Sequence, residues 1–151
     1  MSVNLAVLGG GIYLGTDRTA VASRIEVNGD FGQFRRTVLT PSGTQFGSLH
    51  LALAYQPTFS EGTLSHRFFA AAGYSTTWRY GEISNSNPSL TARIGITVDL
   101  PNIAETALSI EGLGLLHIGE YFFVTGNAGL QLDLHSAQLG VLLFTGAGVS
   151  F

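Results

Sequence analysis

The feature that most constrains this chain is a period of two in its apolar residues. Between 90 and 100, an apolar side chain stands at every second position from Leu90 to Leu100, with Arg93 and Asp99 among the positions between them. Successive side chains of a β-strand point to opposite faces, so this pattern predicts a strand with one apolar and one more polar face. No segment shows the competing helical period of about 3.6 residues. The sequence therefore predicts an all-β fold.

The same alternation recurs along the chain, and turn signals rich in Gly, Pro, Asn, Asp and Ser separate the segments. The longest predicted connections are 57–65 and 81–89. A further candidate over 31–40 has adjacent Arg35 and Arg36, one of which would have to face outward. We therefore expect a loop or an extension beyond the membrane there, and a single antiparallel domain over 1–151 with eight hairpin-connected strands. The predicted strands are 3–15, 19–28, 45–56, 66–80, 90–100, 104–116, 120–134 and 138–151.

The scarcity of charge indicates which way the apolar faces point. Charged residues make up 11% of the chain, against roughly 25% in ordinary soluble domains. Several predicted strands are also longer than the usual length of about 5–6 residues. Twelve residues at roughly 3.3 Å each, tilted by about 40–45°, cover close to the ~30 Å hydrocarbon core of a bilayer. We therefore predict an antiparallel up-and-down transmembrane β-barrel with its apolar faces toward lipid.

Aromatic residues near the predicted strand ends are typical of the girdles that flank such a belt. They are Tyr13, Tyr55, Phe59, Phe68, Trp78, Tyr80, Tyr121 and Phe122. The net charge of −3 and the lack of basic runs argue against nucleic acid as a partner.

The last predicted strand carries a family resemblance. Its segment Gly140–Phe151 alternates and ends in Phe, and it resembles the closing strand of bacterial outer-membrane β-barrels. Length and composition are similar to the eight-stranded OmpA/OmpX-like barrels. The resemblance implies a place in the bacterial outer membrane, with the lipid bilayer, or detergent in its place, around the barrel. It also implies the barrel-assembly machinery as a partner, with Phe151 as the assembly signal. We expect a monomer.

The polar faces of the predicted strands carry nine charged residues that would point into the lumen. A barrel of eight strands has room inside for side chains but not for an open channel. Charges buried there must be paired, because an unpaired buried charge is very costly. We therefore predict a charge network that plugs the lumen. Its members are Arg24, Glu26, Arg67, Arg79, Arg93, Asp99, Glu105, Glu111 and Asp133.

Residues for catalysis or metal binding are sparse. Cysteine is absent, and His50, His66, His117 and His135 show no metal-ligand spacing. Asp133 and His135 share one strand face, and some outer-membrane barrels are lipid A deacylases. Those deacylases carry a His-x-Ser-Asn signature, whereas this chain has His-Ser-Ala-Gln from His135 onward. We therefore expect no enzyme, no cofactor and no metal, and a structural, anchoring or interaction role.

Three other functions remain open from the sequence. The first is a passive pore or transporter, which requires more strands through oligomerisation or a larger parent barrel. The second is a lipid-modifying barrel enzyme that uses His135 with Asp133. The third is a soluble, lipocalin-like barrel that turns its apolar faces inward and binds an apolar ligand.

Overall fold

The structure is a computed structural model that describes residues 2–15, 19–40, 43–79, 88–100 and 105–151, with the backbone alone at 2, 9–10, 33–40, 43–46 and 79. Its described part consists of eight β-strands without a helix. It accordingly contains no helical segment of the length and apolarity that a membrane crossing requires. The strands are β1 (Ser2–Gly15), β2 (Thr19–Thr40), β3 (Gly43–Ser60), β4 (Thr63–Arg79), β5 (Pro88–Leu100), β6 (Ala107–Ile118), β7 (Phe122–Asp133) and β8 (Leu139–Ser150).

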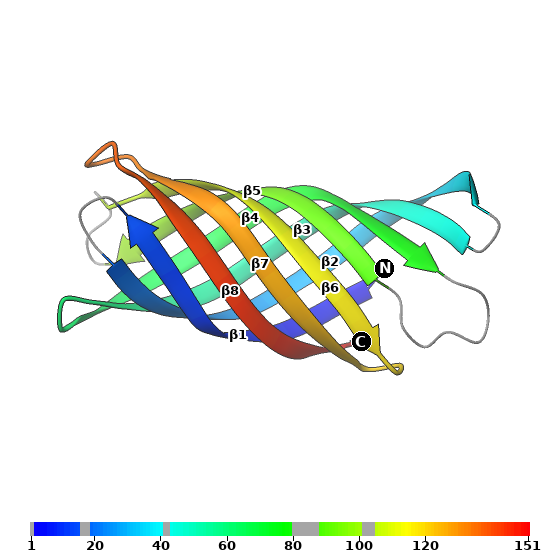
Figure 1. The fold of residues 1–151 in the computed structure, drawn as a ribbon, viewed down its shortest axis with the longest axis horizontal. Helices are drawn as coiled ribbons and strands as arrows, with labels where there is room; N and C mark the ends of the chain where they lie inside the picture. Colours follow the sequence, from blue (N-terminus) through cyan, green and yellow to red (C-terminus); the bar gives the residue numbers. More distant parts are fainter. Residues whose placement is uncertain (1, 16–18, 41–42, 80–87, 101–104) are drawn as a thin grey trace.

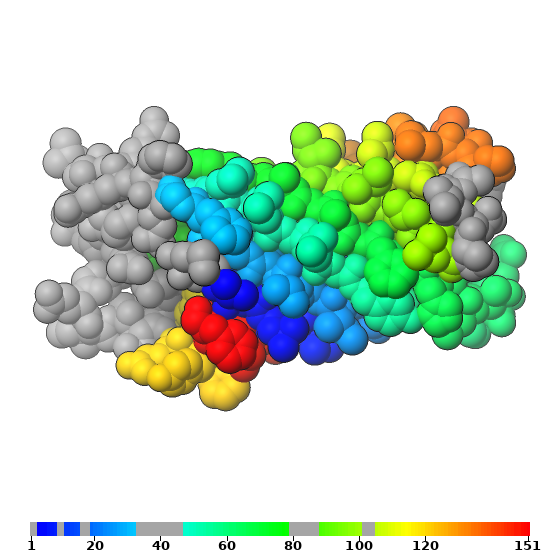
Figure 2. Space-filling view, turned by 180° about the vertical axis from the view of Figure 1, so that it is seen from behind, coloured from blue at the N-terminus to red at the C-terminus, as the bar shows by residue number. Residues whose placement is uncertain are grey.

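Each strand pairs antiparallel with the next, and β8 pairs with β1 to close the barrel (Figure 1). The predicted eight-stranded, antiparallel, all-β fold is confirmed. Both chain ends lie at one end of the barrel, which we call the terminal end. The opposite end, which holds the turn between β3 and β4, is the far end. The space-filling view shows the last residues, in red, beside the first strand, in blue (Figure 2).

The segment 31–40, predicted as a loop or an extension beyond the membrane, is not a loop but continues strand β2. β2 continues to Thr40 and pairs with β3 as far as Gly43. The ladder shifts register between Phe31 and Phe34, where Gly32 has a φ of 64° that suits glycine. Backbone groups make the ladder, so pairing continues through a bulge even where the side-chain alternation is lost.

The connection predicted over 57–65 is also wrong. β3 runs to Ser60 and β4 starts at Thr63, so only Glu61 and Gly62 form the turn. Both have positive φ, 51° and 78°, as in the tight turns that match the twist of a hairpin. The connection predicted over 81–89 lies mostly outside the described residues, and β5 begins at Pro88.

The strands turn large apolar side chains outward and a mixed set inward. β1 contains three consecutive glycines at positions 9–11. Leu5 and Val7 face outward before this triple glycine, and Ile12 and Leu14 face outward after it. The ladders that β1 makes with both neighbours shift register across this stretch. A bulge with one extra residue reverses the parity of the residues beyond it, which explains the change of face.

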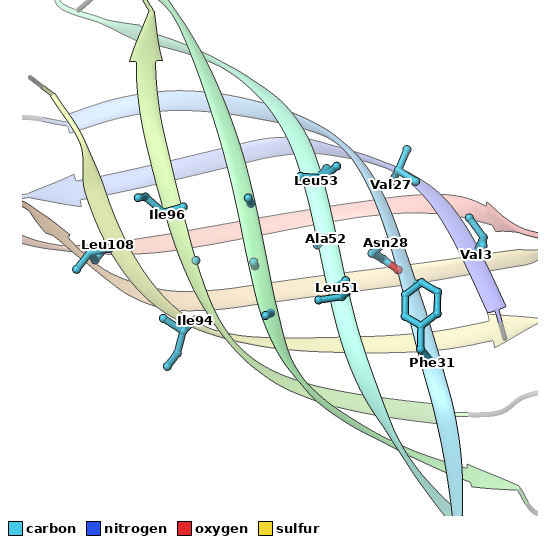
Figure 3. A pocket seen from close by; sticks show the side chains of 15 residues that line it. Val3, Val27, Asn28, Phe31, Leu51, Ala52, Leu53, Ile94, Ile96 and Leu108 are labelled. Atoms are coloured by element: carbon cyan, nitrogen blue, oxygen red, sulfur yellow. The ribbon is translucent and has the colours of Figure 1, made fainter. Parts of the chain in front are cut away.

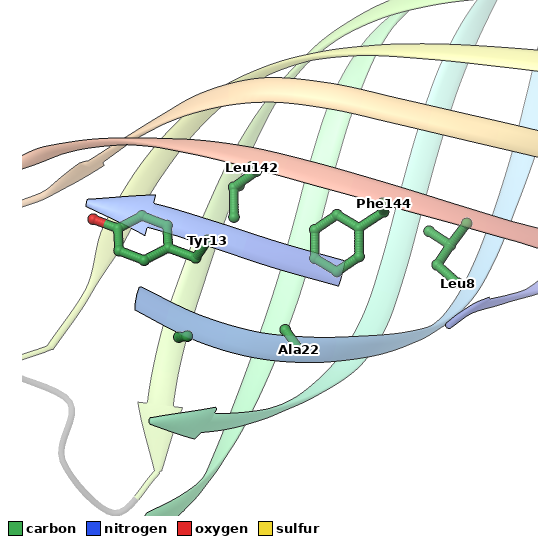
Figure 4. Packing of buried hydrophobic residues seen from close by; sticks show 6 residues of the cluster. Leu8, Tyr13, Ala22, Leu142 and Phe144 are labelled. Atoms are coloured by element: carbon green, nitrogen blue, oxygen red, sulfur yellow. The ribbon is translucent and has the colours of Figure 1, made fainter. Parts of the chain in front are cut away.

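The core lies inside the barrel rather than between layers. One buried apolar cluster gathers side chains of β1, β2 and β8, with Phe144 and Leu8 toward one side and Tyr13 toward the far end (Figure 4). Tyr13, predicted for an outer aromatic girdle, is therefore a lumenal residue, because the glycine bulge reversed its face. Its buried companions are Leu8, Ala20, Ala22, Leu142 and Phe144.

Candidate functional site

Two arginines and two glutamates form a cluster in the middle of the lumen, with side chains at most 1% exposed. β2 supplies Arg24 and Glu26, β5 supplies Arg93, and β6 supplies Glu111. The ladder between β5 and β6 pairs Arg93 directly with Glu111, and Arg24 and Glu26 are two residues apart on β2. The pairs Arg24–Glu111 and Arg93–Glu26 connect β2 with β6 and β5 through the lumen. The cluster is neutral in sum, as burial of charge requires.

The contacts within this cluster have the geometry of strong ion pairs. Arg24 donates through Nη1 and Nη2 to the two carboxylate oxygens of Glu111 at 3.1 and 3.0 Å. Arg93 donates in the same forked way to Glu26 at 2.6 and 2.9 Å, and its Nε donates to Glu111 at 3.0 Å. Such bidentate pairs are stronger and more directional than single contacts. They tie β2, β5 and β6 together through the lumen.

Amide side chains and aromatic rings complete the surroundings of Arg24. Gln56 Oε1 accepts from Arg24 Nε at 3.1 Å and from Nη2 at 2.8 Å. The guanidinium carbon lies 3.9 Å from the ring centre of Phe69 and 4.4 Å from that of Phe144. Both rings therefore hold the cation on their faces. Gly95 leaves room for this arrangement, because a Cβ there would lie 2.3 Å from the Phe69 ring.

A chain of hydrogen bonds leads from the cluster toward the terminal end. Glu26 only accepts, so Asn28 donates to it through Nδ2 at 2.8 Å and accepts from Asn4 Nδ2 at 2.9 Å. The Asn4 oxygen then accepts from the Ser150 hydroxyl at 2.6 Å. The last contact, from His117 Nε2 to Ser150 Oγ, measures 2.9 Å. Because the Glu26 carboxylate can only accept, it determines which group donates in each hydrogen bond of this series.

This direction decides what the contact between His117 and Ser150 can do. A serine nucleophile must give its proton to the histidine. Here the hydroxyl proton goes to Asn4, so His117 Nε2 is the donor toward Ser150 Oγ. The pair is therefore a structural link between β6 and β8, and its geometry is not that of an activated nucleophile.

A second charged group lies toward the far end. Arg67 Nε is 3.6 Å from Asp99, and Arg67 Nη2 is 3.7 Å from Glu105. These separations are too long for hydrogen bonds. Asp133 lies in the same half of the lumen but serves the turn between β7 and β8, where its Oδ1 accepts from the backbone N–H groups of His135 and Ser136 at 2.9 and 3.4 Å.

The remaining predicted residues fall in different places. The side chain of Arg79 is outside the described part of the chain. Phe151 has an 80% exposed side chain, while its N–H donates to the Val3 oxygen at 2.8 Å. His135 is exposed in a turn, and Asp133 meets its backbone nitrogen there. Within the described ranges, no group of three His, Cys, Asp or Glu residues could hold a metal ion.

Sequence reasoning missed the uncharged polar members of the site. These residues are buried and connect the charges, yet no rule of spacing singles them out. Strand parity places all of them on the inward face, which is the one signal that could have found them. They are Asn4, Asn28, Gln56 and Asn127. A separate contact joins the buried His50 to the partly buried Asp30, with Nδ1 and Oδ1 2.9 Å apart.

The outer wall carries a shallow apolar depression of about 670 Å³. Large side chains of β3 and β5 rise on either side of the smaller residues Ala70 and Ala72 of β4 (Figure 3). The depression faces away from the lumen and shares no charged residue with the site. The side chains labelled at its rim include Val3, Val27, Phe31, Leu51, Leu53, Ile94, Ile96 and Leu108.

A closed eight-stranded barrel with an apolar wall and a polar, filled lumen fits the small outer-membrane barrels of the OmpA/OmpX-like kind. No family model and no curated protein matches the chain. Among solved structures, the chain is similar to the crystal structure of the outer membrane enzyme PagL, with a TM-score of 0.60 and 13% identity. The match covers 97% of this chain and 98% of that one. At this identity the likeness concerns the fold.

The comparison corrects one prediction. We predicted that the chain is not an enzyme, because candidate catalytic residues are sparse and the segment from His135 departs from the His-x-Ser-Asn signature. PagL has the same fold over nearly its whole length and is an outer membrane enzyme. A barrel of this fold is therefore compatible with catalysis, and the prediction of no enzyme does not stand.

Proposed function

We propose that this chain spans the bacterial outer membrane as a small barrel with a lumen closed by side chains, and serves a structural, anchoring or interaction role there. The observation that carries the proposal is the neutral charge cluster at the centre of the lumen, inside a wall whose outer face is apolar. The bilayer surrounds the barrel in this account, and the assembly machinery is its folding partner.

The outer wall supports the membrane part of the proposal. Large apolar side chains are exposed on all eight strands, including Ile94 on β5 and Ile110 on β6, each 66% exposed. Soluble monomers rarely show contiguous apolar patches beyond a few hundred Å². Lipid is the solvent that removes the cost of such a wall.

The side chains in the lumen support the proposal that the barrel is closed to ions. An ion that crosses the middle would have to separate Arg24 from Glu111 or Arg93 from Glu26. Each of these pairs is desolvated and held by two hydrogen bonds. Removing one partner of such a pair typically costs about 3–5 kcal/mol. The cluster therefore acts as a plug rather than as a selectivity site.

Conductance in a planar lipid bilayer tests this proposal against the pore alternative. We expect refolded protein to insert without discrete current steps at moderate voltage. The control is a variant with smaller side chains at both partners of one pair, Arg24→Ala with Glu111→Ala, which removes part of the plug without leaving a lone charge. Steps from the variant alone support the plug, and regular steps from the unaltered protein contradict it.

A further inference from the structure

A small cavity lies in the lumen between the central cluster and the far end. Its volume is about 10 Å³. Arg67 of β4 and Gln131 of β7 line it, and Gln56 and Thr58 of β3 line it as well. Tyr13 and Ser60 also line it, and Ala20, Ala22 and Leu142 form its apolar side. The cavity thus has polar walls inside a buried part of the barrel.

Two polar atoms of the residues that line this cavity have no hydrogen-bond partner in the protein. They are the Nε–H donor of Arg67 and the Oε1 acceptor of Gln131. The Arg67 side chain is 8% exposed and Gln131 is 2% exposed. An unsatisfied buried polar atom is costly, and nearly all such atoms in folded proteins have a partner.

We propose that one ordered water molecule occupies this cavity and bridges Arg67 to Gln131. A single water needs roughly 10–15 Å³ of such space and two to four polar partners, and the cavity offers both. The occupant must accept from Arg67 Nε and donate to Gln131 Oε1. Water does both, whereas an anion would face the Gln131 oxygen unpaired and a cation would be repelled by Arg67.

The water would join the two charged groups of the lumen. Gln56 lines the cavity and accepts from Arg24, so it connects the cavity to the central cluster. Arg67 connects the cavity to Asp99 and Glu105 at the far end. Polar groups then succeed one another through the lumen from His117 at the terminal end to Glu105, with this water as the one non-protein link.

The test is a water-selective ROE experiment on ¹⁵N-arginine-labelled protein folded in detergent micelles. The Hε signals are assigned by single arginine-to-lysine replacements. We expect a direct water cross-peak at Arg67 Hε and none at Arg24 or Arg93, because their Nε donors already contact Gln56 and Glu111. Once their signals are assigned, these two arginines are internal controls within the same sample.

The variant Gln131→Met separates a bridging water from bulk water at the barrel mouth. Methionine keeps the volume of the side chain and removes the acceptor. We expect the Arg67 cross-peak to be lost in this variant. Unboiled variant and unaltered protein should run at the same position on SDS gels, which shows that the variant is folded. Two results overturn the proposal. The first is the absence of a water cross-peak at Arg67 Hε in the unaltered protein, and the second is a cross-peak that keeps its full intensity in Gln131→Met.

Discussion

Arg24 shows how a single charged residue can be accommodated in the middle of a barrel. Its guanidinium lies between two phenylalanine rings and donates to Gln56 and to Glu111. The desolvation of the cation is offset only while all of these contacts are present together. The stability of the site therefore depends on complete pairing more than on any one contact.

The most informative single change at this scale is Glu111→Gln. It keeps the shape of the side chain but leaves Arg24 and Arg93 with Glu26 as their one carboxylate in the central cluster. We expect the free energy of unfolding to fall by about 3–5 kcal/mol. Urea titration of the barrel in lipid vesicles measures it.

The matched control for this substitution is Glu120→Gln in the exposed turn between β6 and β7. It removes the same charge where water solvates it, so we expect a change within about 0.5 kcal/mol. Equal losses in the two variants would show that the buried pairing carries no special stability.

At the residue scale, the sequence predicts the inward charges but not their partners. Strand parity places Arg24 and Glu111 on the lumenal face, and the structure has them there. Arg24 and Glu111 are 87 positions apart in the sequence, and their contact joins β2 to β6. The contact therefore depends on how the barrel closes. The amide of Gln56 is harder still to foresee, because an uncharged polar residue on an inward face has no obligatory partner.

Among the elements, β1 and β2 differ most from their predicted form. The triple glycine of β1, at positions 9–11, coincides with register shifts against both neighbours. The pattern could not show that the shift exchanges the two faces and sends Tyr13 inward. The length of β2 was missed because its extension depends on pairing with β3, which is a property of two strands rather than one.

The outward-facing residues in the middle of the strands offer a test that distinguishes a membrane barrel from a soluble one. Ile94 lies at the middle of β5 and points outward. In a bilayer, Ile94→Arg places a cation near the hydrocarbon midplane, and we expect a loss of about 2–4 kcal/mol. The same urea titration in vesicles measures the loss.

Leu100→Arg, at the far end of the same strand and also exposed, is the control for that change. Its cation would lie near the interface, where the expected cost is about 0–1 kcal/mol. A soluble barrel predicts little effect at either position, so equal and small losses would contradict the lipid-facing wall.

At the scale of the whole molecule, the pairing of β1 with β8 closes the sheet into a barrel. The seam is held by the ladder that pairs Asn4 with Ser150, and by the hydrogen bond between their side chains. The alternation and the turn signals predicted eight strands, and composition and strand length predicted that they close into a barrel with an apolar outer wall. They were not enough to decide about catalysis, because the fold is shared by an outer membrane enzyme and the chemistry of a site depends on a few side chains.

We propose that this chain closes into a barrel whose apolar wall faces lipid. The most direct test of this proposal is the mobility on SDS gels of detergent-refolded protein, compared before and after boiling. Because a closed transmembrane barrel resists SDS until heated, we predict a compact, faster band that converts to the mobility of the unfolded chain on boiling. Protein that stays monodisperse in buffer without detergent and shows no shift would contradict the account.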